Sequence, residues 1–359
     1  MADEVYARLA RLLDTLPNGF PATRSGLEVK ILERIFTPEE AALFCDLRLK
    51  AETAEQIAQR TGRPLEGLEE TLITMWQKGE IAGFKYGGVM LFKMMPWIVG
   101  IYEMQLNRMD REFALLCEQY GRHWGRQFIK HGPQIMQVVP VEREIPVNQE
   151  ALTYQQVSSL IESSQSFMVN TCICKKSQGL LNRPCSKPTE VCLAMAQLPG
   201  IFDNSPWGGR LINKEEAYEV LSLAEQAGLV HMTYNVASGH HYICNCCGCC
   251  CGILRAVKMG APNLLNSRYY AEIDPNLCTG CGTCATERCQ VDAIMAGENH
   301  YQIDRRRCIG CGLCATTCPE KAVTLVRKNP DELTCPPGDD NAWLEERARR
   351  RGVDFSAYK

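Results

Sequence analysis

The sequence lacks the features that mark most membrane, secreted and nucleic-acid-binding proteins. Its longest apolar stretch, residues 94–102, is interrupted by Pro96 and Gly100 and is far shorter than the roughly 20 residues that span a bilayer. The first 16 residues mix acids and bases and have no apolar core or cleavage site of a secretion signal. A net charge of -3 provides no basic field for polyanions. We therefore expect a cytoplasmic protein without a membrane-spanning segment.

The common motifs of nucleotide and hydride chemistry are also missing. The sequence has no G-x-G-x-x-G after a strand, no P-loop and no H-E-x-x-H motif. Hydride or flavin chemistry would therefore need a partner subunit. We expect no flavin or nicotinamide site and assign no catalytic residue.

Cysteine, by contrast, is abundant. The chain has 21 cysteines, and 18 of them lie between Cys172 and Cys318. In a chain without a secretion signal, such clustering indicates metal binding rather than disulfides. Cys45 and Cys117 lie outside this region in helical patterns, and we interpret both as small core residues.

A repeat of thirty residues organises eight of these cysteines. Ile-Asp pairs at residues 273–274 and 303–304 each precede a glycine-spaced cysteine run. The second run follows C-x2-C-x2-C-x3-C-P, in which three thiolates hold one [4Fe-4S] cluster and the fourth reaches another. This crossed pattern predicts one cluster on Cys278, Cys281, Cys284 and Cys318, and a second on Cys308, Cys311, Cys314 and Cys289.

At these residues the chain resembles the bacterial two-[4Fe-4S] ferredoxin family, over about residues 270–326. The resemblance implies a small domain that passes single electrons at low potential. The first run departs from the family pattern, because four residues precede Cys289 and Gln290 replaces the usual proline. We expect an altered surface and potential for the cluster bound by Cys289. Zinc fits poorly, because two interlocked runs exceed what a tetrahedral ion needs.

Ten further cysteines follow no ferredoxin pattern. They are Cys172, Cys174, Cys185, Cys192, Cys244, Cys246, Cys247, Cys249, Cys250 and Cys251. Residues i and i+2 of an extended segment share a face, so Cys172 and Cys174 can approach one site while Cys246 and Cys247 diverge. A helix over residues 214–227 and a hairpin over residues 229–243 are expected to bring the two groups of cysteines together.

This middle region resembles multi-cluster iron–sulfur proteins of anaerobes, with C-x-C-K at residues 172–175, C-x6-C at 185–192 and C-N-C-C-x-C-C-C at 244–251. The resemblance implies metal but no particular reaction. We expect one or two additional [4Fe-4S] clusters here. Structural zinc, which C-x2-C spacings favour, and thiol redox chemistry stay open. We interpret His231, His240 and His241 as packed or solvated residues rather than ligands.

The N-terminal part resembles a winged helix. The elements expected there are helices at residues 38–49, 54–60 and 65–79 and a hairpin at residues 81–93. Glu66, Glu69 and Glu70 lie in the expected recognition helix, where they would repel DNA phosphates. We therefore favour a protein-docking or structural role over DNA binding.

Together these patterns predict an α+β multidomain protein, since 359 residues leave room for several cores. The predicted parts are a helix and winged-helix-like domain (1–95), a linker with a long helix at 97–128 and an extended connector (96–150), a mixed α/β cysteine-rich domain (151–260), a two-cluster ferredoxin-like domain (268–328) and a tail (329–359). The tail is expected to be exposed, to end in an arginine-rich helix at residues 342–351 and to dock a partner.

Three functions compete at this stage. The leading hypothesis is an electron-transfer protein, or a subunit of an oxidoreductase complex, that relays low-potential electrons between redox partner proteins. A redox-sensing transcription regulator is the alternative, although the acidic recognition helix argues against it. A third possibility is a catalytic oxidoreductase with its substrate near residues 172–251, for which the sequence shows no nucleotide motif.

Overall fold

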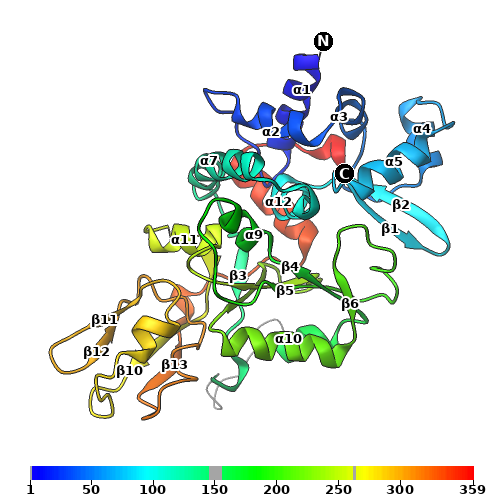
Figure 1. Cartoon of the computed structure of the whole chain (residues 1–359). Helices are drawn as coiled ribbons and strands as arrows, with labels where there is room; N and C mark the ends of the chain where they lie inside the picture. Colours follow the sequence, from blue (N-terminus) through cyan, green and yellow to red (C-terminus); the bar gives the residue numbers. More distant parts are fainter. Residues whose placement is uncertain (1, 145–155, 262–263) are drawn as a thin grey trace.

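The computed structural model describes residues 2–144, 156–261 and 264–359. Its helices are α1 (Ala2–Thr15), α2 (Leu27–Ile35), α3 (Pro38–Phe44), α4 (Ala54–Thr61), α5 (Leu68–Gln77), α6 (Tyr102–Met104), α7 (Arg111–Phe128), α8 (Val157–Glu162), α9 (Ile173–Leu180), α10 (Lys214–Gln226), α11 (Gly252–Lys258) and α12 (Asp340–Arg351). No helix in these ranges has the length and apolar character needed to cross a membrane. Helices α1 to α5 lie at one end of the molecule and the C-terminal strands at the other (Figure 1).

A mixed sheet of seven strands occupies the middle of the molecule, in the order β6-β4-β5-β8-β7-β3-β9. These strands are β3 (Met136–Val138), β4 (Ser166–Thr171), β5 (Glu190–Ala196), β6 (Arg210–Ile212), β7 (Val230–Tyr234), β8 (Tyr242–Cys246) and β9 (Leu265–Asn266). All neighbours are antiparallel except β3 and β9. Because β3 comes from the predicted connector, that segment is an inner strand of the sheet.

The predicted helix and hairpin of the middle region are confirmed. Asn213 caps α10, and the side chain of Glu216 completes a capping box. Strands β7 and β8 pair as a hairpin, with Met232 opposite Cys244. Helices α8 and α10 pack on the sheet through a core that includes Ile161 and Leu221, so the start of the dense cysteine loop, residues 244–251, is fixed by a buried strand.

The N-terminal elements occur in the predicted order. Helices α3, α4 and α5 precede strands β1 (Ala82–Tyr86) and β2 (Val89–Lys93), which pair around Gly87 and Gly88. Thr37 and Thr53 cap α3 and α4 through capping boxes. Helix α5 begins at Leu68, so Glu66 lies just outside it.

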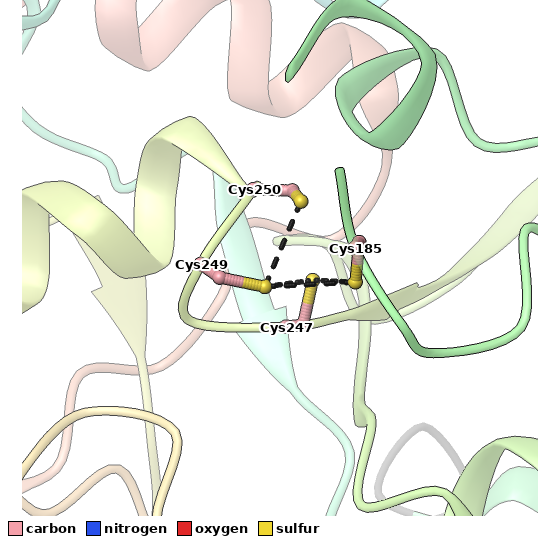
Figure 2. A group of neighbouring side chains, drawn as sticks. All are labelled: Cys185, Cys247, Cys249 and Cys250. Atoms are coloured by element: carbon pink, nitrogen blue, oxygen red, sulfur yellow. Dashed lines mark hydrogen bonds between the residues drawn. The ribbon is translucent and has the colours of Figure 1, made fainter. Parts of the chain in front are cut away.

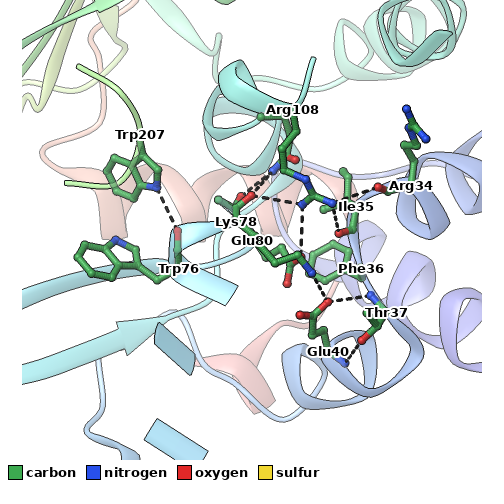
Figure 3. A network of polar contacts seen from close by, with 12 residues as sticks. Arg34, Ile35, Phe36, Thr37, Glu40, Trp76, Lys78, Glu80, Arg108 and Trp207 are labelled. Atoms are coloured by element: carbon green, nitrogen blue, oxygen red, sulfur yellow. Dashed lines mark hydrogen bonds and ion pairs between the residues drawn. The ribbon is translucent and has the colours of Figure 1, made fainter. Parts of the chain in front are cut away.

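A partly buried ionic network joins this N-terminal part to the segment that follows it (Figure 3). Lys78 contacts the carboxylates of Glu40 and Glu80 at 2.5 and 2.7 Å, and Arg108 donates to the carbonyl oxygen of Ile35 at 2.8 Å. Burial raises the pKa of Glu80 to about 7, against the opposing effect of Lys78. The network holds residues 106–108 against α2, α3 and the end of α5.

The predicted long helix at residues 97–128 is wrong in its first half. Helix α7 begins only at Arg111, where the Asp110 side chain accepts a hydrogen bond from the backbone N–H of Phe113. Residues 98–100 have non-helical backbone angles. Pro96 and Gly100 both disfavour a continuous helix, and the cap at Asp110 starts a new one.

The prediction of an exposed C-terminal tail holds for most of residues 329–339 but is wrong for the helix that follows. Trp343 and Arg347 of α12 are 0% and 1% exposed, and they lie one turn apart on the same helical face. The Arg347 guanidinium donates to the backbone carbonyl oxygens of Pro17, Phe128 and Pro133. Helix α12 therefore packs between the N-terminal part and the start of β3, and two of its arginines, Arg347 and Arg351, donate hydrogen bonds to the N-terminal part.

The C-terminal module consists of two small antiparallel sheets. Strand β10 (Tyr269–Ile273) pairs with β13 (Val323–Arg327), and β11 (Ile294–Ala296) pairs with β12 (Tyr301–Ile303). A small core with Ala271 and Leu325 lies between the two cysteine runs. The module forms a distinct lobe below α11 in Figure 1.

Candidate metal centres

The structure brings the eight ferredoxin-type cysteines together in two crossed groups. The first cavity, called the outer cavity here, is lined by Cys278, Cys281 and Cys284 of the first run and by Cys318 of the second. The inner cavity is lined by Cys308, Cys311 and Cys314 of the second run and by Cys289 of the first. These are the two groups that the crossed pattern predicts as ligand sets.

Glycines between the cysteines allow the chain to fold this tightly. Gly282 and Gly312 both adopt a φ of 82°, in the left-handed region that glycine enters without a steric penalty. Backbone N–H groups also point at a sulfur of each run. Ala293 donates to the Cys289 thiol at 3.2 Å, and Ala271 donates to the Cys308 thiol at 3.3 Å. Such bonds orient metal-bound thiolates and tune the potential of a cluster.

The two cavities differ in their exposure. Cys281 of the outer cavity is exposed, whereas Cys314 of the inner cavity is buried. Burial raises the pKa of the Cys311 thiol to about 12. Because a thiol must lose its proton to bind a metal, a cation in the inner cavity would bind together with proton release.

The ten cysteines of the middle region separate into two groups. The four-cysteine group comprises Cys185, Cys247, Cys249 and Cys250, whose sulfur atoms all lie within 4.8 Å of one another. Cys185 comes from the loop between α9 and β5, and the other three come from the dense loop (Figure 2). The sulfur of Cys249 lies 3.6 Å from that of Cys185, 3.2 Å from that of Cys247 and 3.6 Å from that of Cys250.

The remaining six cysteines form a continuous series of thiol contacts, the six-cysteine group. Its members are Cys174, Cys172, Cys192, Cys244, Cys246 and Cys251, in order of contact. Hydrogen bonds from Cys174 and Cys192 hold the pKa of Cys172 well below its ordinary value. A hydrogen bond from Cys192 lowers the pKa of Cys244 to about 5. The expected divergence of Cys246 from Cys247 is confirmed, because they belong to different groups.

Two of the three histidines are packed polar residues. The Nδ1 atom of His231 lies 2.5 Å from Oδ1 of Asn245, and Nδ1 of His240 lies 3.2 Å from the Thr233 hydroxyl. Burial lowers the pKa of both rings. His241 instead lines a large cavity beside the six-cysteine group.

Arg288 attaches the ferredoxin-type module to the middle region, a role that the sequence analysis missed. Its guanidinium donates to the carbonyl oxygens of Glu225 and Gln226 at the end of α10, both at 2.9 Å. It also donates to the carbonyl oxygen of Leu313 at 3.2 Å, within the second cysteine run. Arg288 lies in the loop before Cys289 that is one residue longer than in the family pattern. This extra length is the feature of the sequence that could have indicated the contact.

The large cavity has a volume of about 770 Å³ and was also not foreseen. Its walls come from β4, β5 and β8, from residues 93–106 and from α12, and they include Cys192 and Cys244. Glu103 lines it too, accepts a hydrogen bond from the backbone N–H of Gly100 at 2.7 Å and has its pKa raised to about 8 by burial. No motif in the sequence connects segments so far apart.

Comparison with known families agrees with the second cysteine run. The family model described as the 4Fe-4S binding domain matches residues 301–324. This segment contains Cys308, Cys311, Cys314 and Cys318. Comparison with curated proteins and with solved structures finds no match. The chain thus carries a ferredoxin-type 4Fe-4S segment and a cysteine-rich region, a combination that suggests an iron–sulfur protein and is consistent with electron transfer.

Proposed function

We propose that this chain relays single electrons at low potential through two ferredoxin-type [4Fe-4S] clusters and one further cluster in the middle region. A [4Fe-4S] cluster takes up and releases one electron at a time. The observation that carries the proposal is the crossed arrangement of eight cysteines around two neighbouring cavities. The outer cavity would hold its cluster with Cys278, Cys281, Cys284 and Cys318, and the inner cavity with Cys289, Cys308, Cys311 and Cys314.

The order of the centres follows from exposure and contact. The outer cavity has the exposed thiol of Cys281, which suits exchange with a redox partner protein at the surface. The inner cavity is lined by Cys308 and Cys311, which pack against the same hydrophobic core as Cys246 and Cys251 of the six-cysteine group. Electrons would therefore pass from the outer cluster to the inner cluster and then to the six-cysteine group, or in reverse. Potentials near −400 mV or below, at roughly the low end for ferredoxin-type clusters, are expected for the outer and the inner cluster.

For the six-cysteine group we propose a [4Fe-4S] cluster. The group offers two thiols more than the four that a cubane with only cysteine ligands uses. Its thiols follow one another from Cys174 to Cys251, rather than all meeting at a single point. This extended series suits a cluster, in which each thiolate binds a different iron atom.

For the four-cysteine group we propose a single tetrahedral ion, most simply zinc. Zn–S bonds of 2.3 Å at tetrahedral angles place neighbouring sulfurs about 3.8 Å apart. The sulfur of Cys185 lies 3.7 and 3.6 Å from the sulfurs of Cys247 and Cys249. A cubane needs wider spacing because its four thiolates bind different corners. The ion would clamp the dense loop to the segment before β5, a structural role.

The remaining parts of the chain are proposed to support this relay in the cytoplasm, within or beside an oxidoreductase complex. The N-terminal elements would be a winged-helix-like platform for protein docking. Glu69 and Glu70 lie in the first turn of α5 and are exposed, where they would oppose DNA. We therefore do not favour the transcription-regulator hypothesis.

The double variant Cys172→Ser/Cys244→Ser tests the proposal in the full-length chain. We expect the anaerobically purified variant to lose about four iron atoms and four sulfides, while the low-potential EPR signals of the ferredoxin clusters stay unchanged. The matched control Cys45→Ser/Cys117→Ser alters two buried cysteines outside both groups and should keep all its iron. Unchanged iron in the first variant would remove the middle-region cluster from the relay.

A further inference from the structure

The large cavity beside the six-cysteine group has the size of a small-molecule site. Its volume of about 770 Å³ lies within the range of roughly 300–1,000 Å³ typical of ligand pockets. Cys192 and Cys244, which are neighbours in the series of thiols, both line it. The proposed chain of redox centres thus ends at a cavity rather than at the protein surface.

We propose that this cavity binds a planar, conjugated carbonyl compound, such as a quinone, that accepts electrons from the six-cysteine group. The proposal rests on the proposed relay and adds a terminal acceptor to it. The chain would then be the catalytic subunit of a reductase instead of a carrier between two proteins.

Aromatic and sulfur-containing side chains form part of the cavity wall. Phe202, Trp207 and Tyr234 line the cavity together with Met94, Met95 and Met168. Aromatic rings stack on flat π systems in offset or edge-on geometry, and methionine sulfur makes favourable contacts with ring edges. A planar conjugated molecule satisfies both kinds of side chain better than a branched aliphatic one.

Two unsatisfied polar atoms indicate what the ligand must offer. Asn18 is 5% exposed, and its Nδ2 is fixed by the carbonyl oxygen of Ile98 at 2.6 Å. Within the described part of the chain, the Oδ1 atom of Asn18 and the hydroxyl of Tyr242 are buried without a hydrogen-bond partner. Both residues line the cavity. Buried polar groups are normally paired. The Tyr242 hydroxyl can donate a hydrogen bond to a carbonyl oxygen of the ligand, and Oδ1 of Asn18 can accept one from the hydroxyl that forms when a carbonyl is reduced.

The proposed reaction balances as a two-electron, two-proton reduction. In a quinone, both C=O π bonds break, the ring becomes aromatic, and each oxygen gains one O–H bond. The two electrons come one at a time from a strongly reducing one-electron donor, through the ferredoxin clusters, and the two protons come from solvent. A conjugated acceptor suits this delivery because an unpaired electron can spread over its π system.

A variant that fills the cavity has a matched control on the same strand. Ala194 lines the cavity from β5, whereas Ala196 lies two residues further along the same face and is not part of the wall. The probe is 2,3-dimethyl-1,4-naphthoquinone, whose substituted ring does not alkylate thiols. Binding is measured anaerobically on the oxidised full-length protein by calorimetry, with iron content determined for every sample.

We expect the wild-type chain to bind one probe molecule. Ala194→Phe should bind the probe at least about tenfold more weakly than the wild type, and Ala196→Phe should bind it with unchanged affinity. Tyr242→Phe should weaken binding about three- to tenfold, the usual effect of one lost hydrogen bond. The probe should also shift the EPR signal that Cys172→Ser/Cys244→Ser removes, and it should reoxidise the reduced wild-type protein faster than Ala194→Phe.

Either of two results would overturn this inference while leaving the relay intact. They are full iron content without probe binding, or equal binding to wild type and Ala194→Phe. If the probe binds as expected but the middle region contains no iron, the cavity is a ligand site that the relay does not reach, and the proposed third cluster is wrong. The iron content therefore separates failure of the cavity proposal from failure of the proposed function.

Discussion

The backbone N–H of Gly248 donates a buried hydrogen bond of 2.9 Å to the side-chain oxygen of Gln290. Gly248 lies between Cys247 and Cys249, and Gln290 directly follows Cys289. A Cβ atom at Gly248 would lie 2.1 Å from the carbonyl oxygen of Gln290, so only glycine permits this approach. The replacement of the usual ferredoxin proline by Gln290 therefore creates a direct contact between two metal-binding loops.

Replacing Gln290 with alanine should loosen this contact. The Gly248 N–H would lose its partner in a buried position, which typically destabilises a protein by about 1–3 kcal/mol. We expect a lower melting temperature and a shifted EPR signal of the inner cluster, with full iron content. Gln302→Ala, an exposed change in β12 of the same module, is the control. Identical melting temperatures and EPR spectra for the two variants would show that Gln290 does not connect the two loops.

The crossed assignment predicts a non-local effect of Cys318→Ser. Cys318 belongs to the second run but lines the outer cavity with Cys278, Cys281 and Cys284. We expect the variant to alter or lose the outer cluster and to keep the inner cluster spectroscopically normal. Cys335→Ser, a change in an exposed cysteine of neither run, should leave both unchanged. If the inner cluster is lost instead, ligation is not crossed.

The single-ion assignment predicts that Cys249→Ser affects zinc and not iron. A serine oxygen at this position weakens a tetrathiolate site, because zinc in such structural sites is held by four thiolates. Elemental analysis should show about one zinc per wild-type chain, clearly less in the variant, and equal iron in both. Cobalt substitution of the wild type should give the visible spectrum of a tetrahedral thiolate site. Loss of about four iron atoms from Cys249→Ser would show that the group binds a cluster.

Helix α12 should contribute strongly to stability through Arg347. In Arg347→Met, the carbonyl oxygens of Pro17, Phe128 and Pro133 lose their buried donor. Breaking a buried network of this kind typically costs about 2–4 kcal/mol. Thermal unfolding should occur several degrees lower than in Arg349→Met, which changes an exposed arginine of the same helix. Equal melting temperatures would mean that α12 packs loosely.

Local spacing explains why the ferredoxin cysteines could be grouped from the sequence. Each run places three cysteines and its glycines within seven residues, and the family pattern implies where the fourth goes. The division of the other ten into groups of four and six was out of reach, because it depends on how β5 and β8 pair. The i, i+2 spacing of Cys244 and Cys246 indicated only that these two cysteines share a face of β8.

The C-terminal helix illustrates the opposite limit. Its run of arginines is typical of a solvated surface helix, and nothing in the local sequence indicates that Arg347 meets carbonyl oxygens more than 200 residues away. Likewise, the apolar pattern of residues 97–128 favoured one helix until the cap at Asp110 and the non-helical backbone near Gly100 were seen. Burial against long-range partners determines the first feature, whereas Pro96, Gly100 and the cap at Asp110 determine the second.

The most direct test of the relay is an anaerobic count of iron, acid-labile sulfide and zinc in the full-length wild-type protein. Two ferredoxin clusters, one cluster on the six-cysteine group and one ion on the four-cysteine group predict about twelve iron atoms, twelve sulfides and one zinc per chain. About eight iron atoms and eight sulfides in protein with both ferredoxin signals intact would contradict a third cluster and restrict electron transfer to the C-terminal module.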